Sequence, residues 1–271
     1  MARLRRAWRM FTVSLRVLKT RKELVLFPVV SGVASLLVLA SFATPLVISD
    51  LFHDSTTAAY ALLVLGYFVF AYVTVFCQVA LVSQADVALR DGVPTVAGGF
   101  RTAGRLWSRI LPWALLSATV SQLVRSVEDR APVVVRFVVA MVGAAWSVVT
   151  YLVIPILVLE RVGVRTALQR SVELVKRTWG TNILGNSGVG VVGFLLGLLA
   201  VPIVGLGISS DSSAILTTCI VTAALWLMLV AVLTSALSGI YQTVLYHYAA
   251  AGMVPQQYDR AVLADALPPR R

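Results

Sequence analysis

The stretch AILTTCIVTAALWLMLVAVLTSALSGI, residues 214–240, decides the fold class of this chain. It contains no charged residue over its whole length. A helix of about 20 apolar residues already crosses the roughly 30 Å of hydrocarbon in a bilayer, because each residue adds about 1.5 Å. The stretch therefore predicts a transmembrane helix.

Five further apolar runs have a similar character. They occupy residues 25–49, 58–83, 110–126, 132–159 and 183–208. The run 110–126 is the shortest and reaches Arg125 early, so it either spans the bilayer with little tilt, thins the bilayer locally or packs as a short interior helix. With this run included, the sequence predicts an all-α, polytopic transmembrane bundle of six spans.

The overall composition agrees with a bilayer environment. Apolar residues make up 59% of the chain and charged residues only 13%, far from the composition of a soluble domain. The net charge of +11 could indicate a nucleic-acid-binding protein, so the positions of the cations decide the matter. They gather between the apolar runs, and we therefore expect no nucleic-acid partner.

The same cations fix the expected orientation. Of the 23 Lys and Arg residues, 20 lie in segments 1–24, 84–109, 160–182 and 241–271. The other three are Arg125, Arg130 and Arg136. Basic loops stay in the cytoplasm, so the sequence predicts a plasma-membrane protein with both termini cytoplasmic.

A pattern of roughly 70 to 90 residues recurs three times, in which a basic amphipathic segment precedes a pair of spans. This predicts a single membrane domain over 1–271, built from hairpin units at 1–89, 90–160 and 161–252 with a tail at 253–271. In each amphipathic segment apolar residues recur every three or four positions, as they would in a helix lying at the inner interface.

The cationic edges of the second and third segments are candidate contacts for anionic lipid headgroups. The alternative is that these charges only set topology during insertion. The candidate residues are Arg101, Arg105, Arg109, Arg165, Arg170, Lys176 and Arg177.

Polar residues at the end of the second span form a candidate membrane site, because ionisable groups are expensive to keep in lipid. Its members are Gln78, Gln84, Asp86 and Arg90, and the spacing of the last two allows an ion pair within one helix. The structural reading, in which the two charges simply reach the interface, is favoured over a proton or substrate site.

Packing signals appear in the later spans. Gly193 and Gly197 form a Gly-x-x-x-Gly pattern that allows close approach of another helix, within the bundle by default or across a homodimer. Pro155 and Pro202 are expected to kink their spans. The indole N–H of Trp226 needs an acceptor, so we expect this side chain to face protein.

The chain resembles a family of bacterial six-span membrane proteins of unknown function and, more weakly, the membrane domain attached to some glycerophosphodiester phosphodiesterases. The resemblance implies a fold and no activity. The residues that carry it are Leu26-Phe27-Pro28, Gln78-Val79-Ala80-Leu81-Val82, Gly92-Val93-Pro94-Thr95-Val96, Arg170-Ser171, Trp179-Gly180 and Leu245-Tyr246-His247-Tyr248.

No catalytic or metal-binding arrangement is evident from the sequence, so we expect neither an enzyme nor a cofactor. The preferred interpretation is a non-enzymatic scaffold or accessory component of the membrane. The alternative is a transporter or lipid-handling permease, since an apolar groove for lipid needs few charges. An intramembrane enzyme would require Asp86 and Gln84 to converge with a residue such as His247.

Overall fold

The computed structural model describes residues 23–48, 56–178, 183–210 and 212–251. The predicted N-terminal amphipathic segment and the tail 253–271 lie outside these residues. Within the described part the chain is helical and has no strand. Five helices are long and apolar enough to cross a membrane, which suggests a membrane protein.

The first four predicted spans are helices in the structure. They are α2 (Glu23–Ile48), α4 (Thr56–Leu89), α6 (Trp107–Arg130) and the pair α7 (Val133–Thr150) and α8 (Val153–Leu159). The short third run extends at both ends into a helix of 24 residues. It is therefore long enough to cross a bilayer.

The predicted span 183–208 is helical but, like the fourth span, it is interrupted. It is divided at Leu199 into α10 (Ile183–Leu198) and α11 (Ala200–Ile208), and the part of it that is fully described, Val192–Ile208, is shorter than the five helices of spanning length. Pro202 lies in the first turn of α11, where its missing N–H costs no helical hydrogen bond, so the break falls just before it.

The last span is much longer than predicted. Helix α12 runs over Ser213–Ala251, 39 residues or about 58 Å, and α4 has 34 residues or about 51 Å. Both lengths exceed the hydrocarbon thickness of about 30 Å. Each helix continues past its predicted apolar run, and several side chains of these extensions are buried against other helices.

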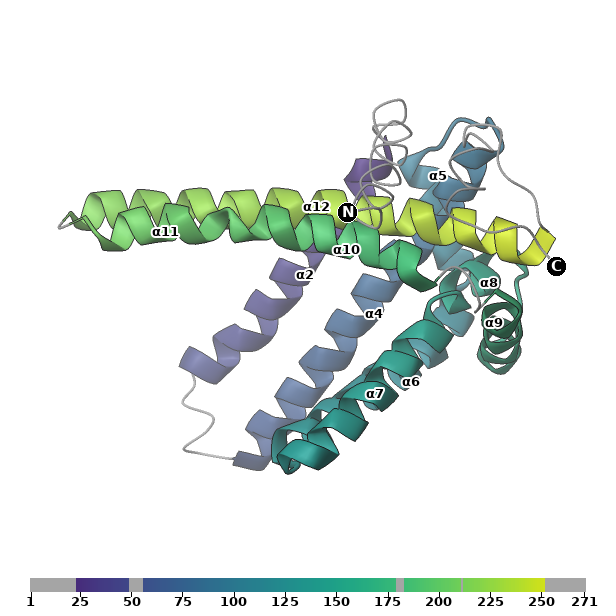
Figure 1. Cartoon of the computed structure of the whole chain (residues 1–271), viewed down its shortest axis with the longest axis horizontal. Helices are drawn as coiled ribbons and strands as arrows, with labels where there is room; N and C mark the ends of the chain where they lie inside the picture. The colour runs from purple at the N-terminus through teal and green to yellow at the C-terminus, as the bar shows by residue number, and fades with distance from the viewer. Residues whose placement is uncertain (1–22, 49–55, 179–182, 211, 252–271) are drawn as a thin grey trace.

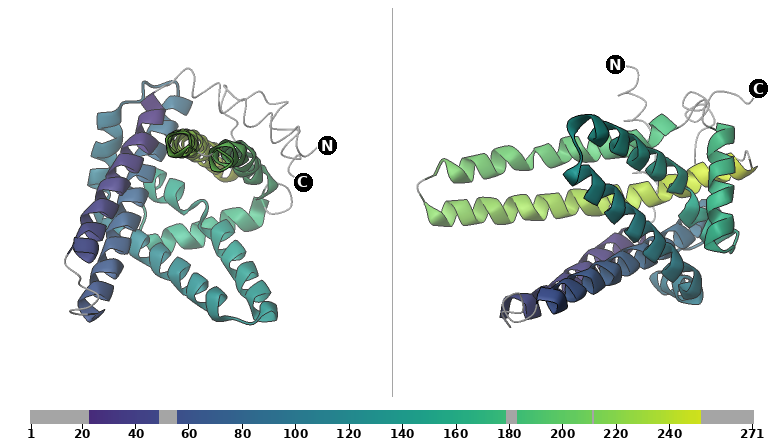
Figure 2. Two further views of the ribbon diagram at one scale, coloured as in Figure 1. Left: turned by 90° about the vertical axis from the view of Figure 1, so that its left-hand side faces the viewer. Right: turned by 90° about the horizontal axis from the view of Figure 1, so that it is seen from below.

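Successive long helices lie side by side and diverge from a common region (Figures 1 and 2). Helix α2 packs along α4, α6 along α7, and α10 and α11 along α12. In Figure 1 the α11–α12 pair runs across the view, whereas α2, α4, α6 and α7 slope away from it. The far ends of the three pairs, which we call the tips, lie well apart.

The apolar core lies where the helices converge, a region that we call the base. Here the C-terminal parts of α4 and α12 meet the start of α2, the start of α6, α8, and the short helices α5 (Val96–Arg105) and α9 (Val164–Thr178). Its largest fully buried side chains are Phe27, Leu24, Ile110, Ile156, Leu157, Leu174, Leu237, Ile240, Val79, Val82 and Val153.

The tips, in contrast, expose apolar side chains that water would not favour. Exposed examples are Leu36, Leu37, Leu65, Phe137, Val138, Leu206, Ile208 and Leu225. Burial at the base and apolar exposure toward the tips are what a bundle would show if lipid surrounded only the tips.

The apolar faces of the predicted interfacial segments contact the base. On α5, Gly99 and Ala103 are buried, and Phe100 packs against Phe27 and Phe76 with ring centroids 5.6 and 6.1 Å apart. Helix α5 ends at Arg105, with Leu106 between it and α6, so Trp107 belongs to α6 and is exposed. The ends of the spans, rather than acyl chains, thus cover most of this apolar stripe.

The turn after α4 is a Schellman motif centred on an acidic residue. Asp91 has a φ of 60°, its N–H donates to the carbonyl of Ala88, and the Gly92 N–H donates to that of Val87. A Cβ on Gly92 would lie 2.6 Å from a Val87 methyl carbon. Glycine is needed here for close approach, while Asp91 takes the left-handed conformation.

Candidate functional site

Asp86 and His247 meet in the base. Asp86 lies near the end of α4 and His247 near the end of α12, and the His247 Nε2 is 2.6 Å from the Asp86 Oδ1. Both side chains are 14% exposed. Arg90 donates to the same oxygen over 3.1 Å from one turn further along α4. The expected Asp86–Arg90 pair therefore exists, with an added histidine partner from a distant helix.

A second group of charges lies beside the first. The Tyr246 hydroxyl donates to Glu160 over 2.9 Å, and its ring meets the His247 ring edge-on with centroids 5.6 Å apart. Arg170 of α9 lies 3.6 Å from Glu160 and donates to Glu173 over 2.9 Å. This network joins α12, α9 and the end of α8.

Arg170 is consequently a charge with partners in its own chain. The hydrogen bond to Glu173, with the nearby Glu160 carboxylate, raises the pKa of Arg170 further above its ordinary value. Arg170 was one of the candidate lipid contacts in the sequence, and the structure places it between two carboxylates, those of Glu160 and Glu173.

Gln84 takes part in helix capping rather than in the Asp86 cluster. It is buried, and its Oε1 accepts the Thr95 N–H over 2.8 Å, while the Thr95 hydroxyl accepts the Gly98 N–H over 3.2 Å. These bonds fix the start of α5 against α4. Gln78 lies on the same helix and is half-buried. The four predicted polar residues thus serve at least two separate contacts.

The kink in the fourth span supplies a polar contact that the sequence analysis missed. Proline has no N–H, so Pro155 leaves the carbonyl of Tyr151 without its helical donor. The Gln242 side-chain amide of α12 donates to that carbonyl. Ser171 of α9 likewise donates to the carbonyl of Val149. Two neighbouring helices thus replace hydrogen bonds lost at the break between α7 and α8.

At the break in the predicted fifth span, a side chain of α12 also donates a hydrogen bond to a backbone carbonyl. The Trp226 indole N–H of α12 donates to the carbonyl of Leu196 over 2.8 Å, just before the break at Leu199. The expectation that Trp226 faces protein is confirmed. Helix α12 therefore supplies a donor at both interrupted helices.

The sequence alone shows that Pro155 interrupts the fourth span and leaves a carbonyl without its backbone donor. It does not show that Gln242 supplies the replacement donor, because Gln242 lies far along the chain. Its Oε1 atom is buried with no hydrogen-bond partner in the described structure.

The remaining candidate cations lie on the surface of the base. Arg101, Arg105 and Arg165 are exposed, as is Lys176, and Arg109 is half-exposed. They come from α5, the start of α6 and α9. The side chain of Arg177 lies outside the described residues.

The Gly-x-x-x-Gly pattern lies against α12 of the same chain. A Cβ on Gly193 would be 2.5 Å from the Thr234 methyl carbon, and one on Gly197 would be 3.7 Å from a Leu227 methyl carbon. Gly193 therefore allows a close approach that any larger residue would prevent.

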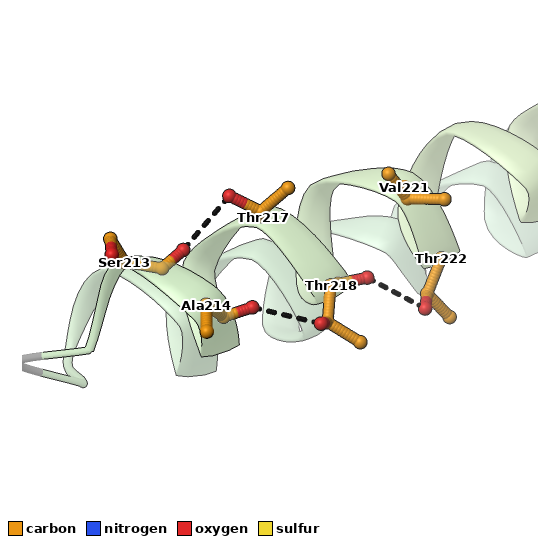
Figure 3. A pocket seen from close by; sticks show the side chains of 6 residues that line it. All are labelled: Ser213, Ala214, Thr217, Thr218, Val221 and Thr222. Atoms are coloured by element: carbon orange, nitrogen blue, oxygen red, sulfur yellow. Dashed lines mark hydrogen bonds between the residues drawn. The ribbon is translucent and has the colours of Figure 1, made fainter.

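Two recesses lie away from the base. One follows a single face of α12 near its tip and is lined by Ser213, Ala214, Thr217, Thr218, Val221 and Thr222 (Figure 3). Thr217, Thr218 and Thr222 each donate to the backbone carbonyl four residues earlier. The hydroxyl hydrogens are thus used within the helix. The other recess lies between α4 and α6 and is mostly apolar.

Metal binding has no evident centre in the described ranges. Across residues 23–48, 56–178, 183–210 and 212–251, no three His, Cys, Asp or Glu side chains gather closely enough to share an ion.

The fold and site define a helical chain with an apolar core and a cluster of charged side chains at its base, and with five helices of membrane-spanning length and apolarity. Residues 57–255 match the model of a family of unknown function, DUF6159, and the chain belongs to this family. No curated protein and no solved structure matches the chain.

Proposed function

We propose that the protein is a six-span membrane protein whose base lies at the inner leaflet, and that it is a non-enzymatic scaffold or accessory component docked on anionic lipid. In this arrangement both termini are cytoplasmic and the tips face outward. The sequence supports this orientation, because 20 of the 23 Lys and Arg residues lie in the four segments predicted to be cytoplasmic and three lie elsewhere.

The observation that carries the proposal is a contrast between two groups of cations on the base: some have carboxylate partners, and others have none among the described residues. Arg90 and Arg170 have carboxylate partners in the chain. The exposed cations are Arg101 and Arg105 of α5 and Arg165 of α9, and the apolar faces of these two helices pack into the base. Their charge is therefore free for lipid phosphates, each worth about 1 kcal/mol near an anionic surface.

The polar groups inside the base support a structural role over catalysis. The Asp86 carboxylate is shared by His247 and Arg90, and that of Glu160 by Tyr246 and Arg170. Groups so engaged hold α4, α9 and α12 together, which a scaffold requires.

Lipid retention by matched double variants tests the proposal. Arg101→Gln with Arg105→Gln removes two base cations from α5, and Arg125→Gln with Arg136→Gln removes two from the tip of the α6–α7 pair. Two contacts of about 1 kcal/mol predict a roughly 30-fold weaker binding of phosphatidylglycerol for the base variant alone. Native mass spectrometry after purification measures this, and added salt should weaken the parent in the same direction.

Equal retention of phosphatidylglycerol by the parent and the base variant would contradict the proposal. An equal loss of phosphatidylglycerol in the two double variants would also contradict it. Lipid retention would then depend on the net charge of the protein and not on the cations of the base.

A lipid-handling permease is the second candidate. The specific observation in its favour is the apolar recess between α4 and α6, since a lipid path needs apolar rather than charged walls.

A further inference from the structure

A cavity of about 400 Å³ lies between α4 and α6, on the tip side of the base. Five residues of α4 and three of α6 line it, including Leu63, Tyr67, Phe68 and Leu123. Its volume is within the range of pockets that hold small ligands. Its walls are mainly hydrocarbon and aromatic, so the occupant that they favour is apolar.

A side chain of α4 reaches across to α6 beside the cavity. The Tyr67 hydroxyl donates to the carbonyl of Ala118 over 3.2 Å. Toward the base, Trp113 and Ala114 of α6 are buried. The helices thus pack closely at one end, and the tyrosine contact adjoins the cavity at the other.

The depth of the cavity corresponds to one leaflet. Its α4 residues run from Tyr60 to Phe68, about 6 to 18 Å along the helix from Thr56. Half of a hydrocarbon core of about 30 Å is about 15 Å. With the tips outward, the cavity is open to acyl chains of the outer leaflet.

A cation continues the same face of α6 toward the tip. Thr119 and Leu123 line the cavity, and Arg130 follows them at spacings of 11 and 7 residues, close to whole helical turns. Arg130 is exposed and lies about 10 Å beyond Leu123 along the helix. It has no ion-pair partner among the residues described.

We propose that this cavity holds one acyl chain of an outer-leaflet phospholipid whose phosphate contacts Arg130. The lipid fills the space between α4 and α6 and keeps the two pairs of helices at a fixed separation. The assignment rests on the orientation proposed above for the leaflet, although the cavity and its cation are independent of the base.

The test uses the full-length protein in nanodiscs that contain only phosphatidylcholine, followed by transfer to detergent and native mass spectrometry. This zwitterionic lipid removes any contribution from anionic headgroups at the base. Leu63→Trp fills the cavity, and Leu65→Trp is its matched control, because Leu65 is exposed on α4 but does not line the cavity. Arg130→Gln removes the phosphate contact without altering a packed residue.

The parent and Leu65→Trp should retain one phosphatidylcholine. Leu63→Trp should retain at least about tenfold less, since losing the burial of two methylene groups already has that effect. Arg130→Gln should retain up to about fivefold less, as expected for one exposed ion pair with the phosphate of about 1 kcal/mol at most.

Parental retention by Leu63→Trp or by Arg130→Gln overturns the proposal, as does an equal loss in Leu63→Trp and Leu65→Trp. Detergent in place of phosphatidylcholine in the parent also overturns it. A failure at the base would appear separately, in the phosphatidylglycerol measurement on the Arg101 and Arg105 variant.

Discussion

The His247 Nε2 lies 2.6 Å from the Asp86 Oδ1, although the two residues are 161 positions apart in the chain. This contact joins the ends of α4 and α12, the two longest described helices. Both helices extend beyond their apolar runs, and the contact lies in those extensions. The contact therefore holds the ends of α4 and α12 together at the base.

Replacing Asp86 and His247 by alanine, singly and together, should reveal an energetic coupling between them. We expect a coupling of about 0.5 to 3 kcal/mol in the free energy of unfolding, because the two side chains touch and are mostly shielded. Denaturant unfolding in detergent, followed by tryptophan fluorescence, measures it. Arg90→Gln serves as a control at an exposed partner and should cost about 1 kcal/mol or less.

Gln242→Leu should destabilise the protein by about 1 to 3 kcal/mol, because it removes the donor to the Tyr151 carbonyl. Pro155→Ala returns a backbone N–H four residues after Tyr151. The cost of Gln242→Leu should therefore be smaller in the Pro155→Ala background than in the parent. An equal cost in both backgrounds, from the same unfolding experiment, would show that the proline does not create the need for Gln242.

Trp226→Phe should destabilise the protein more than Trp146→Phe does. Both changes replace the indole by a smaller phenyl ring, but Trp226→Phe also removes the 2.8 Å hydrogen bond to the Leu196 carbonyl. Trp146 instead packs against Trp113, with ring centroids 6.4 Å apart. The difference should be about 1 kcal/mol in thermal or denaturant unfolding. A larger loss in Trp146→Phe would mean that packing outweighs the carbonyl contact.

Two glycines of α5 should respond oppositely to alanine. At Gly99 a Cβ would lie 2.5 Å from a Phe27 ring carbon and 3.0 Å from the Ala80 carbonyl oxygen, whereas at Gly104 nothing lies within 4 Å. Gly99→Ala should lower the melting temperature through a clash worth about 1 to 3 kcal/mol. Gly104→Ala should be neutral or raise stability by up to about 1 kcal/mol through helix propensity.

Much of the helical layout could be predicted because membrane spans are encoded locally. Uncharged runs such as 214–240 mark their own positions, and Pro155 and Pro202 mark the breaks near Tyr151 and Leu199. The predicted span 183–208 is helical over the same residues, but it is interrupted at Leu199, just before Pro202. A hydropathy pattern does not register that interruption.

The candidate site was harder to predict because its partners are remote. Asp86 could be singled out, but the sequence placed both it and His247 beyond the ends of their spans. The reason is that polar residues stop an apolar run even when the helix continues into protein. Glu160, Ser171 and Gln242 carry no local pattern that pairs them with α12 or with a broken helix.

Accessibility in intact cells tests the orientation, on which both the base and the lipid assignments depend. With the two free cysteines, Cys77 and Cys219, replaced by alanine, single cysteines at Ser212 and Ser108 probe a tip and the base. Both serines are exposed. The account predicts that an impermeant maleimide labels Ser212→Cys in intact cells and labels Ser108→Cys only after permeabilisation. Labelling of Ser108→Cys but not of Ser212→Cys in intact cells would contradict it.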